Sequence, residues 1–134
     1  MHLSHRARRG LVIAVATLFA LALAGPAQGA RDEPAEGLRL TVSGNENGWT
    51  RGVQLLCDPE PAGTHPEAAA ACAALTKARG DFDKLPAESR ACNKRYDPVT
   101  VAATGTWGDR PTEWTRTYGN ACELGAATGA VFRF

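Results

Sequence analysis

The sequence predicts an α+β domain in which short antiparallel β-strands are covered by a helix. Several stretches alternate apolar and polar residues, as half-buried strands do, and they are separated by turns rich in Gly, Pro and Asn. One alanine-rich stretch in the middle of the chain has the composition of a helix instead. About five strands and one clear helix are expected, which places the chain in the α+β class.

Residues 1–30 have the features of a cleaved secretion signal peptide. Arginines at positions 6, 8 and 9 precede a mainly apolar stretch at 11–24, and small residues follow at 25–30. The apolar stretch is too short for a membrane span, which needs about 20 residues. Cleavage between Ala27 and Ala30 is expected to give a secreted, extracellular protein without a membrane partner.

The mature chain is the size of one domain, with a flexible leader at 31–37 and a folded part at 38–134. Of the 15 basic residues, three lie in the signal peptide, which leaves 12 against 14 acidic residues and a net charge of −2. This balance argues against a nucleic-acid partner, since such proteins usually carry a strongly basic face.

All four cysteines lie in the mature part, at Cys57, Cys72, Cys92 and Cys122. Export to an oxidising compartment predicts two disulfides, for which three pairings are possible. The sequential pairing would close loops of about 15 and 30 residues, each stabilising the fold by about 3 kcal/mol. A zinc site is disfavoured because no pair has the C-x-x-C spacing.

The first half of the domain predicts two strands and a helix. Residues 38–42 alternate as a strand, residues 43–48 form a turn, and a second strand follows at 53–57. Three prolines and a glycine make 58–66 an irregular surface loop.

The predicted helix covers 68–78. Thr64 and Glu67 have the spacing of a capping box, Pro66 is expected in the first turn, and Gly80 ends the helix.

The second half predicts a hairpin and a final strand. Residues 99–107 alternate as a strand, 108–111 form the turn, and 112–118 return as its partner. A Gly- and Ala-rich connection at 119–129, with one helical turn, leads to a last strand at 130–134.

The chain lacks the residues of an enzyme active site. Neither Ser43 nor Ser89 lies in a Gly-x-Ser-x-Gly turn. Asp81 and Asp83 form a solvated turn by the usual behaviour of charged loops, and His65 has no motif around it, so a structural role is expected. No phosphate-binding glycine loop or metal-ligand cluster is present, and no cofactor is expected.

The stretch 92–98 is the most informative part of the chain. It holds the basic pair Lys94 and Arg95 between Cys92 and Pro98. A basic pair on an exposed loop is a substrate for trypsin-like proteases, yet a disulfide and a proline would restrain it. The plain alternative is a solvated cationic turn between a helix and a strand.

Several separate motifs resemble the Streptomyces subtilisin inhibitor family. They are the cysteine separations of 15 and 30 residues and the stretches 63–66, 96–99, 120–123 and 131–134. Together they extend over nearly the whole mature domain. The resemblance implies a five-stranded antiparallel sheet with two helices, disulfides Cys57–Cys72 and Cys92–Cys122, and a homodimer that associates through sheet faces.

The resemblance also implies a secreted inhibitor of serine proteases, trypsin-like or subtilisin-like, that acts as a restrained substrate. The reactive bond lies two residues after the third cysteine, between Lys94 and Arg95. Asn120 would support the loop from behind. The other residues expected to contact the protease are Ala91, Cys92, Asn93, Tyr96 and Asp97.

Two positions depart from the family pattern. Asn93 stands where proline is common, so a less stiff loop is expected, and Arg95 stands where a small aliphatic residue is usual. The basic pair leaves a second register open, in which Arg95 is the specificity residue for proteases that cut dibasic sites.

Two other functions compete with inhibition. One is a secreted, non-inhibitory binding module that uses Trp49, Trp107 and Trp114 as a contact surface. The other is a small hydrolase, which the missing nucleophile makes the least favoured.

Overall fold

A computed structural model describes residues 25, 36–45 and 48–134 of the chain. Apart from Gly25, the signal peptide and its cleavage site lie outside the described residues. The strands are β1 (Leu38–Gly44), β2 (Thr50–Leu56), β3 (Ala62–Gly63), β4 (Val99–Trp107) and β5 (Arg110–Tyr118). The helices are α1 (Ala68–Lys77) and α2 (Ala121–Thr128), with 3₁₀ helices η2 (Phe82–Lys84) and η3 (Gly129–Phe132).

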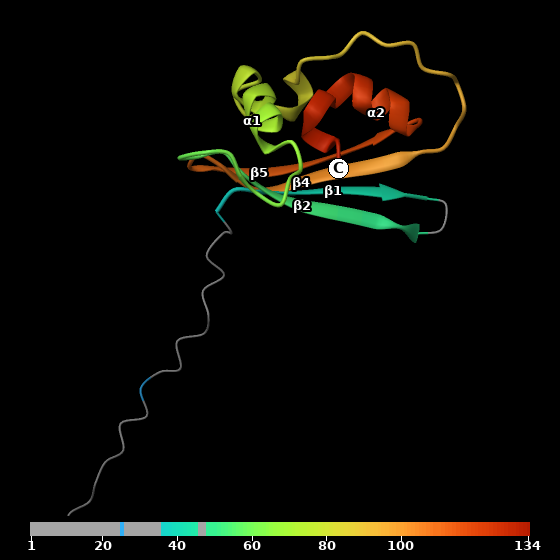
Figure 1. Ribbon diagram of the computed structural model, residues 1–134. Coiled ribbons are helices and arrows are strands. Elements are labelled where there is room, and N and C mark those ends of the chain that lie inside the picture. Colours follow the sequence, from blue (N-terminus) through green and yellow to red (C-terminus); the bar gives the residue numbers. More distant parts are fainter. Residues whose placement is uncertain (1–24, 26–35, 46–47) are drawn as a thin grey trace, which may run out of the picture. The chain divides into compact units, whose positions relative to one another are not determined.

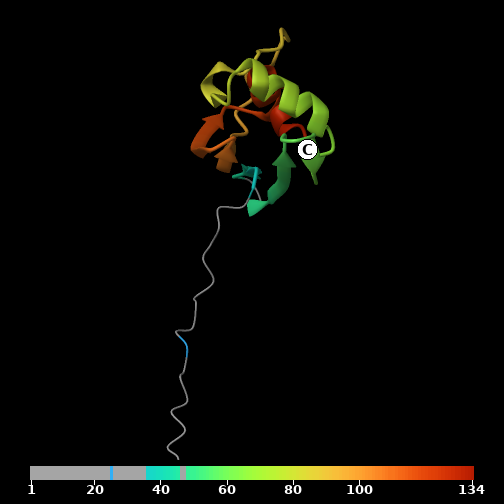
Figure 2. The ribbon, with the colours of Figure 1, turned by 90° about the vertical axis from the view of Figure 1, so that its left-hand side faces the viewer.

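The strands form one antiparallel sheet in the order β3-β2-β1-β4-β5. Both helices lie over the same face of this sheet, and none of the described helices or strands covers the opposite face (Figures 1 and 2). The predicted α+β class, five-stranded sheet and two helices are therefore confirmed. None of the helices in the described part of the chain is long and apolar enough to cross a membrane.

The core lies between the sheet and the helices. In β1 the buried residues Leu38, Leu40 and Val42 alternate with Arg39, which is exposed. This alternation points every second side chain toward the helix layer, as the pleat of a strand requires. The buried partners from the helical layer are Leu75, Phe82, Leu124, Val131 and Phe132.

The predicted strand at 130–134 is wrong, because the chain forms the 3₁₀ helix η3 there. Val131 and Phe132 are adjacent and both buried, which a strand with a single buried face does not allow. The fifth strand is instead β3, inside the predicted loop 58–66, where it pairs with the end of β2. Gly63 has φ +100° there, and a Cβ at this position would lie 2.3 Å from the carbonyl oxygen of Gln54.

The predicted capping box at the start of α1 is also wrong. Thr64 Oγ1 accepts a hydrogen bond from the backbone N–H of Gln54 on β2, and Glu67 is an N-cap without a side-chain bond. His65 takes the capping role: its Nδ1 accepts from the N–H of Glu67 at 2.9 Å and its Nε2 donates to the carbonyl of Val131 at 3.0 Å. This buried imidazole therefore joins the start of α1 to the C-terminal segment, and its role is structural.

Several element boundaries differ from those expected. β1 extends to Gly44 and β2 begins at Thr50, where an end at 42 and a start at 53 were predicted. Pro66 precedes α1 instead of lying in its first turn. The hairpin turn between β4 and β5 is only Gly108 and Asp109, since Trp107 already pairs with Arg110. The connection after β5 contains the eight-residue helix α2, where a single turn was expected.

α1 ends at Lys77 with Ala78 as its C-cap, and the left-handed residue after the cap is Arg79, with φ +55°, so the predicted stop at Gly80 is one residue too late. Gly80 follows it and gives a testable consequence. Its φ is +76°, and a Cβ would lie 2.3 Å from Cδ1 of Trp107. Gly108→Ala is a matched control, because φ is +61° and nothing lies within 4 Å of the new Cβ. We expect Gly108→Ala to lower the free energy of unfolding by about 1–3 kcal/mol through backbone strain. Gly80→Ala should cost about 1–3 kcal/mol more because Trp107 has to move. Urea denaturation measures both, and equal losses would contradict the packing argument.

Candidate functional site

The candidate site is the long irregular segment 85–98, which runs from η2 to the start of β4 (Figure 1). Its tip lies beside the start of α2, where Cys92 is bonded to Cys122. Ala91, Asn93, Lys94 and Arg95 are exposed, and Tyr96 has 79% of its surface exposed. The segment becomes buried again only at Pro98 and Val99. Its tip therefore presents the basic pair to solvent.

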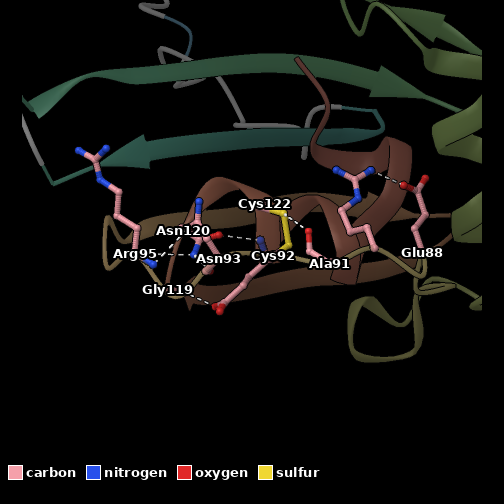
Figure 3. Close-up of a disulfide and its surroundings, with 10 residues drawn as sticks. Glu88, Ala91, Cys92, Asn93, Arg95, Gly119, Asn120 and Cys122 are labelled. Atoms are coloured by element: carbon pink, nitrogen blue, oxygen red, sulfur yellow. Dashed lines mark hydrogen bonds and ion pairs between the residues drawn. A yellow bond between two sulfur atoms is a disulfide. The ribbon is translucent and has the colours of Figure 1, made fainter.

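A disulfide attaches the tip to α2. Cys92 is bonded to Cys122, with Cα atoms 5.7 Å apart, and Cys57 is bonded to Cys72, with Cα atoms 5.5 Å apart. The sequential pairing is confirmed. Sγ of Cys122 also lies 3.8 Å from the carbonyl oxygen of Ala91, so the chain before the bridge lies against it (Figure 3).

Asn120 lies behind the tip and is the N-cap of α2. Its Oδ1 accepts a hydrogen bond from the N–H of Glu123 at 2.9 Å, which satisfies one of the free donors at the helix start. Its Nδ2 donates to the carbonyls of Asn93 at 3.2 Å and Arg95 at 3.0 Å (Figure 3). One buried carboxamide therefore fixes the helix start and both carbonyls that flank Lys94.

The side of the tip that leads into β4 is tied to the same region. The N–H of Asp97 donates to the carbonyl of Gly119 at 2.9 Å. Gly119 is held in turn, because its N–H donates to Oε2 of Glu123 at 3.2 Å. The turn before α2 is thus held by a side chain of that helix, and it holds the loop in turn through the bond to Asp97.

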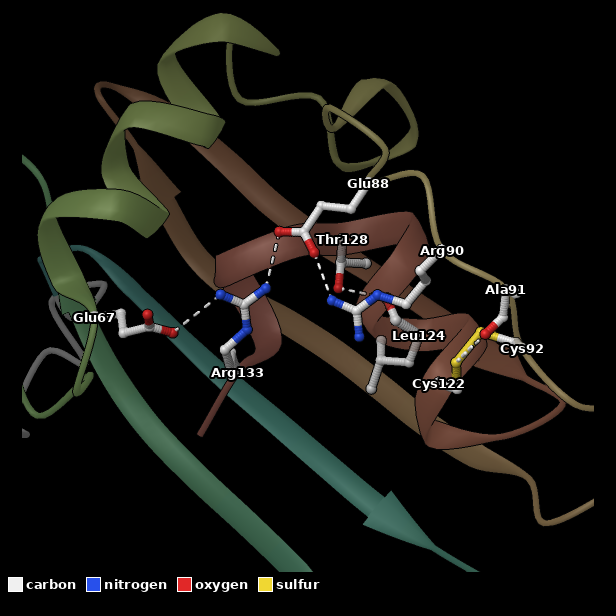
Figure 4. A network of polar contacts seen from close by, with 9 residues as sticks. All are labelled: Glu67, Glu88, Arg90, Ala91, Cys92, Cys122, Leu124, Thr128 and Arg133. Carbon is white, nitrogen blue, oxygen red and sulfur yellow. Dashed lines mark hydrogen bonds and ion pairs between the residues drawn. A yellow bond between two sulfur atoms is a disulfide. The ribbon is translucent and has the colours of Figure 1, made fainter.

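The preceding side of the loop is held by Glu88. Its N–H donates to the carbonyl of Ala126 at 2.7 Å, and its carboxylate binds Arg133 at 2.9 Å and also pairs with Arg90 (Figure 4). Arg133 forms a second, longer ion pair with Glu67 at 3.6 Å, too far for a hydrogen bond. Arg133, and after it Arg90, hold the pKa of Glu88 below its ordinary value. These side chains are partly exposed, so they contribute more to position than to stability.

The tip also contains a short internal hydrogen bond. Oδ1 of Asn93 accepts from the backbone N–H of Arg95 at 3.1 Å. Within the described residues, neither Lys94 nor Tyr96 forms a hydrogen bond. The loop is therefore held at positions 93, 95 and 97, and the two residues between them are free to contact another molecule.

The structure brings most of the predicted loop residues together. Ala91, Cys92, Asn93, Arg95 and Asp97 all contact residues 119–122 or one another, while Lys94 and Tyr96 are held only through the chain. Sequence reasoning missed three further supports, Glu88, Gly119 and Arg133. Only Arg133 lay in a stretch that carried the resemblance.

The other candidate features have structural partners. Asp81 accepts from the N–H of Asp83 at the start of η2 and pairs with Lys84, which lowers its pKa. Asp83 pairs with Arg116 at 2.9 Å and accepts from the indole N–H of Trp114 at 3.1 Å. In the part of the chain that the structure describes, no cluster of three or more His, Cys, Asp or Glu residues could hold a metal ion.

The tryptophans do not form one contact surface. Trp114 stacks against Phe82 and Phe132, with its ring centroid 5.2 and 5.8 Å from theirs, and so packs against the core. Trp49 is 37% exposed, under the guanidinium of Arg51. A cleft of about 610 Å³, lined by Leu38, Leu55, Pro59 and Trp107 among others, lies at the opposite end of β1 and β4 from the loop.

Comparison with known proteins gives one consistent family. The family model described as "Subtilisin inhibitor-like" matches residues 34–120. The chain is 42% identical over 132 residues to the subtilisin inhibitor of Streptomyces violaceus, covering 90% of each protein. It is 48% identical over 85 residues to subtilisin inhibitor-like protein 4 of Streptomyces lavendulae, covering 63% of this chain and 73% of that protein.

A solved structure agrees with these relatives. Streptomyces caespitosus sermetstatin, crystallised in complex with Bacillus licheniformis subtilisin, matches with a TM-score of 0.60 and 31% identity. The match covers 72% of this chain and 96% of sermetstatin.

The double role of Asn120 is testable with two variants. Asn120→Ala removes both the cap and the loop bonds, so we expect the free energy of unfolding to fall by about 1 kcal/mol or more. Asn120→Asp keeps an acceptor for Glu123 but cannot donate, and it places a carboxylate against the carbonyls of Asn93 and Arg95. We expect Asn120→Asp to retain most of the stability and yet to speed amide exchange at Asp97, as measured by hydrogen-exchange NMR. Unchanged exchange at Asp97 in both variants would contradict the loop-supporting role.

Proposed function

The chain belongs to the subtilisin inhibitor-like family, and on this premise we propose that it inhibits serine proteases by presenting residues 91–97 as a restrained substrate. The members it resembles are inhibitors, not enzymes. The observation that carries the proposal is the pattern of the loop: an exposed basic tip whose neighbouring backbone groups are fixed from behind by a disulfide and one buried amide.

The proposed mechanism follows from this restraint. The protease serine attacks the carbonyl carbon of Lys94, and the oxyanion hole binds its oxygen, as on any substrate. When the peptide bond breaks, the amine of Arg95 stays near the acyl group, because Cys92, Asn120 and the start of β4 hold both sides of the break. Groups held in this way have effective molarities of about 10⁵ M or more, so the bond re-forms faster than water hydrolyses the ester.

The hydrogen bonds favour Lys94 over Arg95 as the specificity residue. The attacked carbonyl has to enter the oxyanion hole, so it cannot remain bonded to the inhibitor's interior. The carbonyl of Arg95 already accepts from the buried amide of Asn120 at 3.0 Å, whereas the carbonyl of Lys94 is unbonded within the described residues. An attack on Arg95 would have to break the support of the loop, and this argues against the second register.

Two classes of protease fit the proposed site. The ammonium of Lys94 is exposed and suits a specificity pocket with a carboxylate at its base, as in trypsin-like enzymes. Subtilisin-like enzymes are supported by the relatives' names and by the sermetstatin complex. We propose both as targets.

We further propose that the mature protein is a secreted homodimer. The open face of the sheet has small side chains in its centre, where Thr41, Ala102 and Thr115 form one cross-strand row. The neighbouring row runs from Gln54 through Arg39 and Thr104 to Glu113, so it holds two opposite charges on β1 and β5. A two-fold axis through this face would pair these charges between subunits. We also propose that residues 1–30 are removed on export, and that residues 31–37 remain as a leader before the domain that begins at Leu38.

The reactive bond is tested with a matched pair of variants. The wild-type protein should inhibit trypsin stoichiometrically and be cleaved slowly after Lys94. Lys94→Met should weaken trypsin inhibition about 10- to 100-fold, the value of a charge-assisted contact, and shift preference toward subtilisin. Arg95→Met should leave the preference unchanged. The reverse result would establish the second register, and a wild-type protein that inhibits neither enzyme would favour a non-inhibitory binding module.

The dimer is tested by placing a charge on the open face. Ala102→Arg should give a monomer by light scattering coupled to gel filtration, because a buried, unpaired charge opposes association. Lys77→Ala, on α1 and on the other side of the sheet, should remain dimeric. A monomeric wild-type protein at the same concentration would refute the proposal.

A further inference from the structure

The hydrogen bond inside the loop involves the nitrogen of the proposed reactive bond. The carboxamide oxygen of Asn93 accepts from the backbone N–H of Arg95 at 3.1 Å. This nitrogen is the atom that leaves when the bond between Lys94 and Arg95 is cleaved. The side chain that precedes the specificity residue therefore reaches past it to the leaving group (Figure 3).

Asn93 is itself held in place. Its main-chain carbonyl accepts from Nδ2 of Asn120 at 3.2 Å, and the preceding residue is Cys92, which is bonded to Cys122. The carbonyl of Arg95 accepts from the same Nδ2 at 3.0 Å. The backbone of Arg95 is thus fixed through its N–H by Asn93 and through its carbonyl by Asn120.

We propose that Asn93 is a positioning residue for the leaving amine, an inference that rests on the proposed function. When the carbon–nitrogen bond breaks, the nitrogen of Arg95 gains a proton from the protease base and becomes an amine. One N–H of this amine keeps its hydrogen bond to Oδ1 of Asn93. This bond orients the amine so that its lone pair points toward the acyl carbon. In the reverse step this lone pair forms the peptide bond, the bond between the acyl carbon and the serine oxygen breaks, and the base passes the extra proton from the nitrogen to that oxygen.

If Asn93 has this role, the absence of proline at position 93 does not simply make the loop less stiff. The family pattern suggested that a loop with Asn93 would be less stiff than one with proline at this position. A proline restrains its own φ and the conformation of the residue before it, but it carries no side-chain acceptor. Asn93 instead restrains the residue two positions later, on the far side of the reactive bond. The chain therefore has a restraint across this bond that proline could not supply.

The test compares Asn93→Ala with Asn93→Ser, which differ by one oxygen atom. A catalytic amount of trypsin brings the intact and the cleaved forms of each protein to equilibrium from both directions, and mass spectrometry measures their ratio. This ratio belongs to the free inhibitor, so contacts between residue 93 and trypsin do not enter it. In the acyl-enzyme the protease holds both ends of the break and the bond to Asn93 persists, whereas in the released cleaved protein the new amine is free and the bond is lost. We therefore expect Asn93→Ala, which removes the bond from the intact form only, to raise the ratio of cleaved to intact protein about fivefold, the effect of one neutral hydrogen bond.

Asn93→Ser should give an intermediate ratio, because a hydroxyl accepts the same bond more weakly. Residue 93 is exposed, so both variants should unfold at the wild-type temperature, which separates positioning from a general loss of stability. A ratio for Asn93→Ala equal to that of the wild type, or equal ratios for Ala and Ser, would overturn this inference alone. A wild-type protein that is neither an inhibitor nor cleaved after Lys94 would overturn the proposed function, and the inference with it.

Discussion

The carboxamide of Asn120 is the constraint on which the loop depends. A helix N-cap needs only an acceptor, which Ser, Thr or Asp supplies as well as Asn does. Asn is the residue that also carries two donor hydrogens, and here both reach loop carbonyls at 3.0 and 3.2 Å. The oxygen is committed to α2 and the nitrogen to the loop, so the position of the tip is set by the start of the helix. Since α2 packs on the core through Leu124 and Thr128, the tip inherits the rigidity of the domain.

The other contacts that hold the loop are individually weak, but they lie at the two ends of the tip and so restrict its conformation. Glu88 and its arginines are partly exposed, and such ion pairs contribute little to stability. They fix the chain just before the disulfide, however, and the bond between Asp97 and Gly119 fixes it just after the tip. A segment fixed at both ends has little conformational entropy left to lose when a partner binds, so more of the contact energy appears as affinity.

Local patterns predicted those parts of the molecule whose cause is local. The alternation of 38–42 and of 99–107 gave two central strands, and the alanine-rich stretch gave α1, because burial of one face is written in the residues themselves. The family resemblance supplied the disulfide pairing, α2 and Asn120.

The predicted strand at 130–134 was wrong because Val131 and Phe132 are both buried by α1 and the sheet, which no local pattern reveals. The capping box failed because Thr64 bonds to β2 instead. Glu88 and Arg133 are 45 residues apart, so their pairing could not be read from spacing.

The loop combines these supports in an alternating pattern. Positions 93, 95 and 97 bond backward to residues 119 and 120, while the backbones of Lys94 and Tyr96 form no hydrogen bond within the described residues. Positions that are bonded to the turn before α2 therefore alternate along the segment with positions that are not. Under the proposed function, the unbonded backbone groups of Lys94 and Tyr96 would pair with the protease cleft, as in strand addition. The bonds to residues 119 and 120 would at the same time keep the cleaved ends from leaving, as the ends of an ordinary substrate do.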